Sequence, residues 1–230
     1  MKLSLLLAAA GLVAIGEAQQ KLKVMFLGDS ITEITCWRPQ VWTQLQAANL
    51  TGSIQLVGSM NSIGGSCQKP AGFDARHEGH SGYQAYDVAR NNIAGWVRST
   101  QPDVVNFMLG TNDVNIGKRN QQAILDAYTS ILNSLRAANA NVSVIIDKMI
   151  PTSWSDATIE GVNTQIPGWA AKYTTAQSPI TVADCSRAAG MTNNMLQGDK
   201  VHPNSQGDAF IAKQIGPVLI KALNAKLGRA

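Results

Sequence analysis

Short apolar runs recur along the chain, separated by longer stretches in which apolar and polar residues mix. The runs show almost no polar alternation, which is typical of strands buried on both faces of a parallel sheet. Five such strands are predicted, at residues 23–27, 54–57, 104–109, 142–146 and 180–183.

The stretches between the runs carry the spacing of amphipathic helices. Residues 124–135 place apolar side chains at i, i+3, i+4 and i+7, and residues 210–223 form a second apolar stripe, in which Pro217 is expected to kink the helix. Weaker helical patterns cover residues 39–48, 85–97 and 159–173. Because strand and helix alternate five times, we predict one doubly wound α/β domain with a five-stranded parallel sheet flanked by helices.

The first eighteen residues have the pattern of a secretory signal peptide. Lys2 provides the positive charge, residues 3–15 form an apolar segment, and Gly16 and Ala18 are small residues at the expected cleavage site. The segment is shorter than the ~20 apolar residues of a membrane-spanning helix, and a buried N-terminal helix is the alternative. We therefore expect a signal peptide at 1–18, a mature domain at 19–230, and a secreted protein without a membrane partner.

Composition and charge exclude several classes of protein. Hydrophobic residues make up 45% of the chain and charged residues 15%, as in globular proteins rather than disordered or fibrous ones. The 19 Lys and Arg residues outnumber the 15 Asp and Glu residues, but no run of four basic residues occurs. The net charge of +4 is thus spread thinly, and no nucleic-acid partner is expected.

Three cysteines allow one disulfide and leave one thiol over. We expect Cys36 to pair with Cys67, because both lie in loops that follow the first two predicted strands, and an oxidising exterior permits the bond. Cys185, in an apolar segment, is then a small buried hydrophobic residue. Asn49 and Asn141 begin N-x-S/T triplets and are candidate glycosylation sites in a secreted protein.

Candidate catalytic residues follow the first strand and precede the last helix. Ser30 stands in Gly28-Asp29-Ser30, where a turn from a buried strand into a helix would expose its hydroxyl at the sheet edge. A helix cap is the alternative. A nucleophilic serine needs a base, and Asp199 lies three residues before His202, a spacing that lets the carboxylate turn back to the imidazole. A surface Asp–His pair is the alternative.

Two further blocks offer hydrogen-bond donors. Asn112, in Gly110-Thr111-Asn112-Asp113 after the third strand, could direct its amide at a developing oxyanion, while Asp113 could cap the turn; a merely polar turn is the alternative. The run His77-Glu78-Gly79-His80-Ser81-Gly82 contains glycines whose N–H groups can approach a ligand closely. Its histidines are one residue too close for the zinc motif H-E-x-x-H, so no metal is expected there.

Together the four blocks resemble, in order and spacing, the SGNH hydrolases, also called GDSL-type esterases. The chain carries G-D-S, a second block with glycine, G-x-N-D, and D-x-x-H near its C-terminus, and the resemblance spans Val24 to His202. Ile31 stands where the family's common name expects leucine. The first three blocks look most like those of the fungal acetylxylan esterases of carbohydrate esterase family three. The fold implied is the SGNH, flavodoxin-like three-layer sandwich.

Carried over residue by residue, the resemblance implies a nucleophile at Ser30, a general base at His202 and an orienting carboxylate at Asp199. It implies an oxyanion hole made by the backbone N–H groups of Ser30 and Gly82 and the side-chain amide of Asn112. Gly82 matches the family's second block better than Gly79 does, because the glycine there follows a small polar residue.

We therefore expect a secreted serine esterase that removes O-acetyl groups from acetylated xylan, as a monomer and without metal or cofactor. Trp154 and Tyr83 are candidate sugar-stacking residues at the rim of the site; for Trp154, burial in the core is an equal alternative. The functional alternatives are a general short-chain carboxylesterase, a deacetylase of another glycan, and a non-catalytic carbohydrate-binding domain. The absence of G-x-S-x-G disfavours the lipase-type α/β-hydrolase fold, and the absence of G-x-G-x-x-G disfavours a nucleotide cofactor.

Overall fold

The computed structural model describes residues 20–153 and 156–229, and within these residues seven strands form one sheet. β1 lies at its centre, with β5, β6 and β7 following on one side and β2 and β4 on the other. All neighbours pair in parallel except β3 and β4. The strands are β1 Leu22–Gly28, β2 Ile54–Val57, β3 Met60–Asn61, β4 Arg76–Gly79, β5 Val104–Met108, β6 Ser143–Lys148 and β7 Ile180–Asp184.

The five predicted strands are confirmed, but the predicted strand count is wrong, because β3 and β4 add to them to make seven. β2 pairs with the first half of β1, and β4 pairs with its last two residues. Both strands therefore lie along the same edge of β1, one after the other. β4 has no apolar pattern: His77 and Glu78 are fully buried and find polar partners from distant segments. A polar strand of this kind gives no periodicity that a sequence can reveal.

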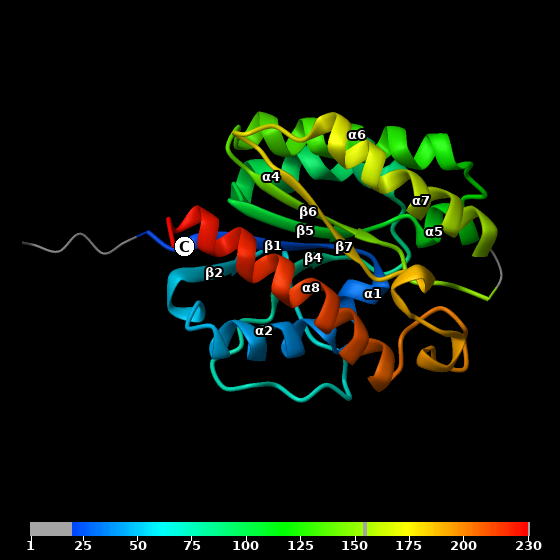
Figure 1. Cartoon of the computed structure of the whole chain (residues 1–230), viewed down its shortest axis with the longest axis horizontal. Helices are drawn as coiled ribbons and strands as arrows, with labels where there is room; N and C mark the ends of the chain where they lie inside the picture. The colour runs from blue at the N-terminus through cyan, green and yellow to red at the C-terminus, as the bar shows by residue number, and fades with distance from the viewer. Residues whose placement is uncertain (1–19, 154–155, 230) are drawn as a thin grey trace, which may run out of the picture.

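Helices cover both faces of the sheet: α4, α6 and α7 lie on one side and α2 and α8 on the other (Figure 1). The helix predicted over residues 85–97 consists of two α-helical pieces joined by a π-helical turn, Val88–Asn92. α8 continues through Pro217 as one helix. The helices are α1 Ser30–Glu33, α2 Trp37–Ala47, α3 Ala85–Asp87, α4 Ile93–Thr100, α5 Thr111–Asn115, α6 Gln121–Ala138, α7 Asp156–Tyr173 and α8 Ser205–Lys226.

The central strand explains why the apolar runs show no alternation. Met25 and Leu27 of β1 belong to the core beneath α4, α6 and α7, whereas Val24 and Phe26 belong to the core beneath α2 and α8. All four side chains are at most 1% exposed. Successive residues of a strand point to opposite faces, so a sheet covered on both sides requires apolar residues at every position.

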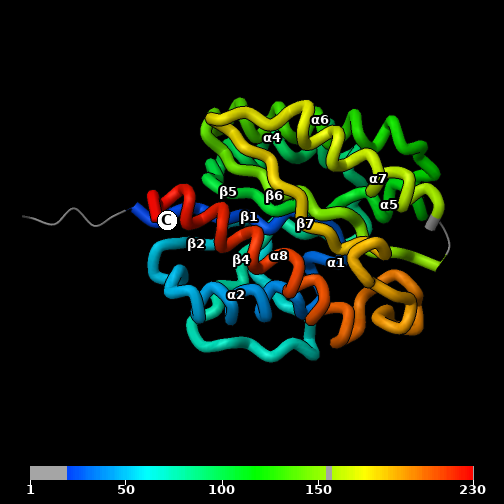
Figure 2. Tube along the Cα trace, viewed as in Figure 1, coloured from blue at the N-terminus to red at the C-terminus, as the bar shows by residue number. Residues whose placement is uncertain are grey.

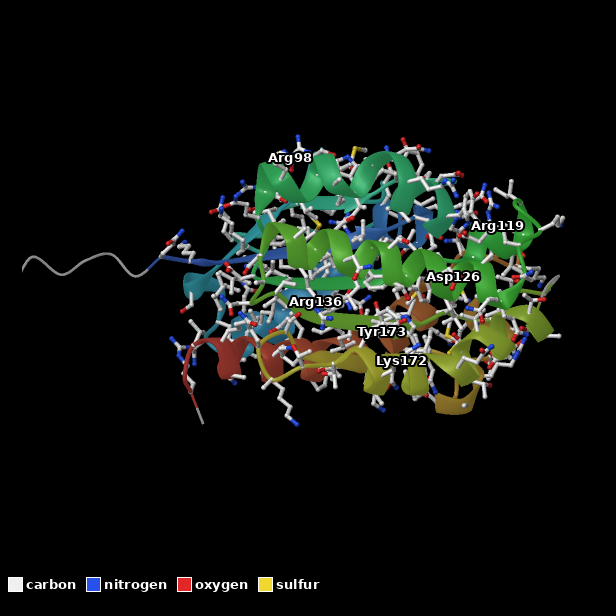
Figure 3. The ribbon with its side chains drawn as sticks, turned by 90° about the horizontal axis from the view of Figure 1, so that it is seen from above. Arg98, Arg119, Asp126, Arg136, Lys172 and Tyr173 are labelled. Atoms are coloured by element: carbon white, nitrogen blue, oxygen red, sulfur yellow. A yellow bond between two sulfur atoms is a disulfide. The ribbon has the colours of Figure 1, made fainter. Side chains whose placement is uncertain are left out.

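Polar contacts also tie the helices on one face to each other and to the sheet. Arg136 of α6 donates to the carbonyl of Tyr173, the last residue of α7, at 2.7 Å, and the two residues lie close together in Figure 3. The same guanidinium donates to the carbonyl of Ser178 at 2.9 Å, which ties the start of β7 to α6. None of the helices in the described part of the chain is long and apolar enough to cross a membrane.

Cys36 and Cys67 form the expected disulfide, with their Cα atoms 5.2 Å apart. Cys185 keeps its thiol and is fully buried, and burial raises its pKa well above the ordinary value. Asn49 and Asn141, the two candidate glycosylation sites, are exposed. The predicted signal peptide at 1–18 lies outside the described residues.

Candidate active site

Three segments that are far apart in sequence meet at the carboxyl end of the sheet. α1 follows β1, α5 follows β5, and the segment from β7 to α8 returns to the same end (Figures 1 and 2). This is where sites form in open α/β sheets, because the loops after neighbouring parallel strands converge there.

Ser30 is the first residue of α1, and only Asp29 separates it from the end of β1. Asp29 caps the helix, with its Oδ1 accepting from the N–H of Ile31 at 2.9 Å. The serine side chain therefore sits at a helix start, where backbone N–H groups have no partner within the helix. Ser30 is only 9% exposed.

His202 and Asp199 complete a hydrogen-bonded chain with this serine. His202 Nε2 lies 2.7 Å from Ser30 Oγ, and His202 Nδ1 lies 2.7 Å from Asp199 Oδ2. With the proton on Nδ1, the ring donates to the carboxylate and Nε2 is left to accept the serine proton. This is the geometry of a nucleophile, a base and an orienting acid.

Local backbone geometry explains why the D-x-x-H spacing works. Lys200 adopts a left-handed conformation, with φ of 61°, and turns the chain so that Asp199 faces His202. Asp199 Oδ1 also accepts from the N–H groups of Val201 and His202, at 2.9 and 3.0 Å. Partial burial opposes the charged form, but the hydrogen bonds from the His202 imidazole and these two N–H groups hold the pKa of Asp199 below its ordinary value.

Asn112 approaches from α5 and is 8% exposed. Its Nδ2 donates to the carbonyl of Tyr83 at 3.0 Å and lies 3.3 Å from Asp29 Oδ2. Gly110, just before the helix, has φ of 116°, and a Cβ there would lie 2.6 Å from the Sδ of Met149. Only glycine adopts this φ readily and leaves room for the Met149 side chain. The glycine of the G-x-N-D block is therefore required by the backbone geometry of the turn.

The two candidate glycines of the second block differ in the use of their N–H groups. The N–H of Gly79 lies within β4 and donates to His77 Nδ1 at 2.9 Å. Gly82 is exposed, has φ of 82°, and no described residue accepts its N–H. Because Tyr83 is bonded to Asn112, Gly82 is held next to the amide side chain. These contacts favour Gly82 over Gly79 as a donor to a bound oxyanion.

Comparison with known proteins identifies the family of this chain. The GDSL-like lipase/acylhydrolase family matches residues 26–210. The chain belongs to this family. No curated protein sequence matches it significantly.

Solved structures place the esterase more narrowly. It is 66% identical, with a TM-score of 0.88, to a carbohydrate esterase of family 3 from Talaromyces cellulolyticus, over 89% of this chain and 99% of that chain. The same values hold for a serine-to-alanine mutant of an acetyl esterase crystallised with an acetate ion. A family 3 carbohydrate esterase from Clostridium thermocellum is 27% identical, with a TM-score of 0.74, over 90% of this chain and 98% of that chain. The protein is therefore an ester-hydrolysing enzyme related to the carbohydrate esterases of family 3.

The carboxyl of Asp29, next to Ser30 in the chain, has an unusually high pKa. Burial raises its pKa to about 7, although the hydrogen bond from the Ile31 N–H and the nearby His202 favour the charged form. Asp113, a possible cap of its own turn, accepts from the N–H groups of Ala85 and Tyr86, at 2.6 and 3.0 Å. It thereby links the G-x-N-D block of the esterase to the start of α3.

The two predicted sugar-contacting residues have different outcomes. Tyr83 is 37% exposed and bonded to Asn112, and its contact with sugar stays a prediction. Trp154 lies outside the described residues. Trp96 is half-buried, and its ring is stacked against His80, which lies two residues before Gly82 in the chain.

The histidines of the H-E-G-H run have separate structural contacts. His77 is fully buried; burial, followed by the proximity of Arg38 and His80, lowers its pKa to about 3, so its ring is neutral. His80 instead bonds to Glu78. The sequence assigns Gly82 of this run to the oxyanion hole, but it gives His77, Glu78 and His80 no role in the site. Within residues 20–153 and 156–229, no three metal-ligating side chains come together.

Proposed function

We propose that the protein is a secreted serine esterase that removes O-acetyl groups from acetylated xylan. Ser30 is the nucleophile, His202 the general base and Asp199 the residue that orients it. The Ser30 N–H, the Gly82 N–H and the Asn112 amide form the oxyanion hole. The observation that carries the proposal is the 2.7 Å contact between Ser30 Oγ and His202 Nε2, continued by the 2.7 Å contact to Asp199.

In the first half of the reaction, Ser30 Oγ attacks the acetyl carbonyl while His202 Nε2 takes the hydroxyl proton. The carbonyl oxygen becomes an oxyanion that accepts hydrogen bonds from the three donors. Collapse of this intermediate breaks the bond to the sugar oxygen. His202 returns its proton to that oxygen, so the sugar leaves as an alcohol and the acetyl group remains on Ser30.

In the second half, water replaces the sugar. His202 takes a proton from the water as it attacks the acetyl-serine, and the same donors stabilise the second oxyanion. Collapse returns the proton to Ser30 Oγ and releases acetic acid, which ionises in solution. Throughout the cycle, Asp199 stays charged and stabilises the imidazolium that forms twice.

A cavity of about 530 Å³ lies between α2, the disulfide and the start of α8; the triad residues do not line it, but segments next to them in the chain do, and its lining suits a carbohydrate. Its wall includes Pro203, next in the chain after the histidine, and Ile34, whose N–H donates to the carbonyl of Ser30 at 2.9 Å. The amide side chains of Gln40 and Gln68 also line it. The volume falls in the range of small-molecule sites, ~300–1,000 Å³, and neutral amides can bond to the hydroxyls of an uncharged sugar.

The similar solved structures are named acetyl esterase and carbohydrate esterase, which supports an acetyl ester of a carbohydrate as the substrate. Tyr83 and Trp154 are proposed to contact sugar rings at the rim. The signal-like residues 1–18 and the disulfide support secretion, since disulfides persist in oxidising compartments. The enzyme is proposed to act as a monomer on a neutral polymer, for which the charge of +4 provides no steering.

The test measures acetate release from acetylated xylan by the wild type and by Ser30→Ala. p-Nitrophenyl acetate, butyrate and octanoate are assayed beside it. We expect the wild type to act on xylan and on acetate esters, and Ser30→Ala to be inactive on both. Full activity of Ser30→Ala would refute the serine mechanism. Hydrolysis of long acyl esters with none of xylan would favour the general carboxylesterase, and binding of xylan without acetate release would favour the binding domain.

A further inference from the structure

A four-residue turn, His80 to Tyr83, presents Gly82 to the active site. The N–H of Tyr83 donates to the carbonyl of His80 at 3.1 Å, which closes the turn, and Gly82 has φ of 82°. A positive φ near +80° at the third residue is characteristic of a type II turn, which requires glycine there. In this turn the N–H groups of His80, Ser81 and Tyr83 all have partners, whereas that of Gly82 has none among the described residues and can bond to a ligand.

The start of the turn is fastened to a buried carboxylate. His80 Nε2 lies 2.7 Å from Glu78 Oε1, and the Glu78 side chain is 0% exposed while that of His80 is 14% exposed. Glu78 also accepts from the N–H and the hydroxyl of Ser59, at 2.8 and 2.5 Å. The carboxylate is thus held by two independent segments, and it holds the imidazole in one orientation.

Aromatic packing fixes the same ring from another side. The His80 ring lies 4.5 Å from the Trp96 ring, with 7° between their planes, and 4.8 Å from the Tyr83 ring, with 24° between planes. Trp96 belongs to α4, so the stack joins both ends of the turn to one of the helices that cover the sheet. Stacked rings at such distances add stability beyond the area that they bury.

A second carboxylate holds the middle of the turn. Glu33, at the end of α1, accepts from the N–H and the hydroxyl of Ser81 at 2.7 and 2.6 Å. The backbone N–H of His80 donates to the carbonyl of Gly28 at 3.0 Å. Both anchors lie within three residues of Ser30 along the chain, so the turn is fastened to the segment that carries the nucleophile.

We propose that His80 is a positioning residue for ester hydrolysis, which holds the turn so that the Gly82 N–H faces the oxyanion. The bond to Glu78 and the stack on Trp96 fix the imidazole, and the imidazole fixes the turn. This inference rests on the proposed function, in which Gly82 belongs to the oxyanion hole. Because that hole acts in both halves of the reaction, loosening the turn lowers kcat without weakening substrate binding.

The experiment compares His80→Ala, His80→Gln and Trp96→Phe with the wild type. kcat and KM are measured on p-nitrophenyl acetate, and thermal unfolding is followed for each variant. The matched control is Trp169→Phe, because the Trp169 ring also packs against an aromatic ring, that of Tyr173 at 5.5 Å, but on α7 away from the turn. His80→Gln keeps an N–H donor for Glu78 but loses the imidazole ring. Trp96→Phe keeps an aromatic ring that can stack on His80.

We expect His80→Ala to lower kcat by up to about a hundredfold, the cost of misplacing a catalytic group by roughly 1 Å, with KM within about twofold of the wild type. His80→Gln should recover part of the lost kcat, and Trp96→Phe and Trp169→Phe should keep most of it. A folded His80→Ala or His80→Gln with wild-type kcat overturns the inference, as does a change confined to KM or an equal loss in Trp169→Phe. If Ser30→Ala is fully active, the proposed function itself fails; if it is inactive while the His80 variants are unimpaired, only this inference fails.

Discussion

Replacing Asn112 with alanine removes a hydrogen-bond donor from the active site and also releases a neighbouring loop. In the intact site Nδ2 donates to the carbonyl of Tyr83 at 3.0 Å and lies 3.3 Å from Asp29 Oδ2. Nδ2 carries two N–H groups, which donate to these two acceptors in the resting site, and the proposed mechanism redirects the one on Asp29 to the oxyanion. Alanine at this position therefore takes away both the donor and the tether that holds the turn carrying Gly82.

The expected magnitude follows from these two losses. Removing one donor from an oxyanion hole typically costs ~2.7–4 kcal/mol, or about a hundred- to a thousandfold in kcat. Asn112 is only 8% exposed, so bulk water has little access to replace its amide. Since the Tyr83 contact is lost as well, we expect a fall in kcat near the upper limit, about a thousandfold, with KM almost unchanged.

The assay is steady-state hydrolysis of p-nitrophenyl acetate, with acetate release from acetylated xylan as a second measure. Asn112→Asp keeps the shape but replaces the donor with an oxygen, so it should be as slow as Asn112→Ala. Asn115→Ala is the control, because Asn115 ends the same short helix and its buried Oδ1 has no hydrogen-bond partner among the described residues. A kcat of Asn112→Ala within about threefold of the wild type, or a loss in KM alone, would refute the oxyanion role.

Three further predictions address the triad, the buried carboxyl and the disulfide. Asp199→Asn should lower kcat on p-nitrophenyl acetate by roughly 10⁴-fold, because an amide does not hold the required imidazole tautomer; unchanged kcat would contradict the role of Asp199. Burial raises the pKa of Asp29 from 3.8 to about 7, so the folded protein keeps a proton that the unfolded chain has released and loses stability as pH rises between these values. Denaturant titrations at pH 4 and 8 should show Asp29→Asn gaining roughly 4 kcal/mol relative to the wild type at the higher pH; parallel pH profiles would exclude this. Replacing Cys36 and Cys67 together with alanine should lower the free energy of unfolding by ~3.7 kcal/mol on the chain-entropy model, given their separation of 31 residues, and an unchanged Tm would argue against it.

Local sequence patterns predict most of this fold. The central strands are recognisable because a sheet covered on both faces needs apolar side chains at every position, as Val24 to Leu27 show. α6 is recognisable because its apolar stripe is continuous, and Asn204 is recognisable as the cap of α8, where it accepts from the N–H groups of Gln206 and Gly207. The disulfide also follows from the loop positions of its two cysteines.

The edge of the sheet shows where such reasoning stops. β4 consists of Arg76, His77, Glu78 and Gly79, a segment without apolar periodicity, yet it is largely buried. Its polar groups are satisfied by partners such as Ser59, 19 residues away from Glu78. Partners at that separation depend on how the chain folds back on itself, so no local pattern reveals them.

The sequence by itself determined the order of strands and helices and the residue types that carry the proposed chemistry, because both follow from short-range spacing and from turn geometry such as that of Asp199 to His202. Only the tertiary structure decided which glycine has an unpaired N–H, that Asp29 is buried enough for its pKa to rise to about 7, and that Glu78 and His80 hold the turn before Gly82. These properties depend on exposure to water and on partners from distant segments. Both come into being when the sheet brings the carboxyl ends of its strands together.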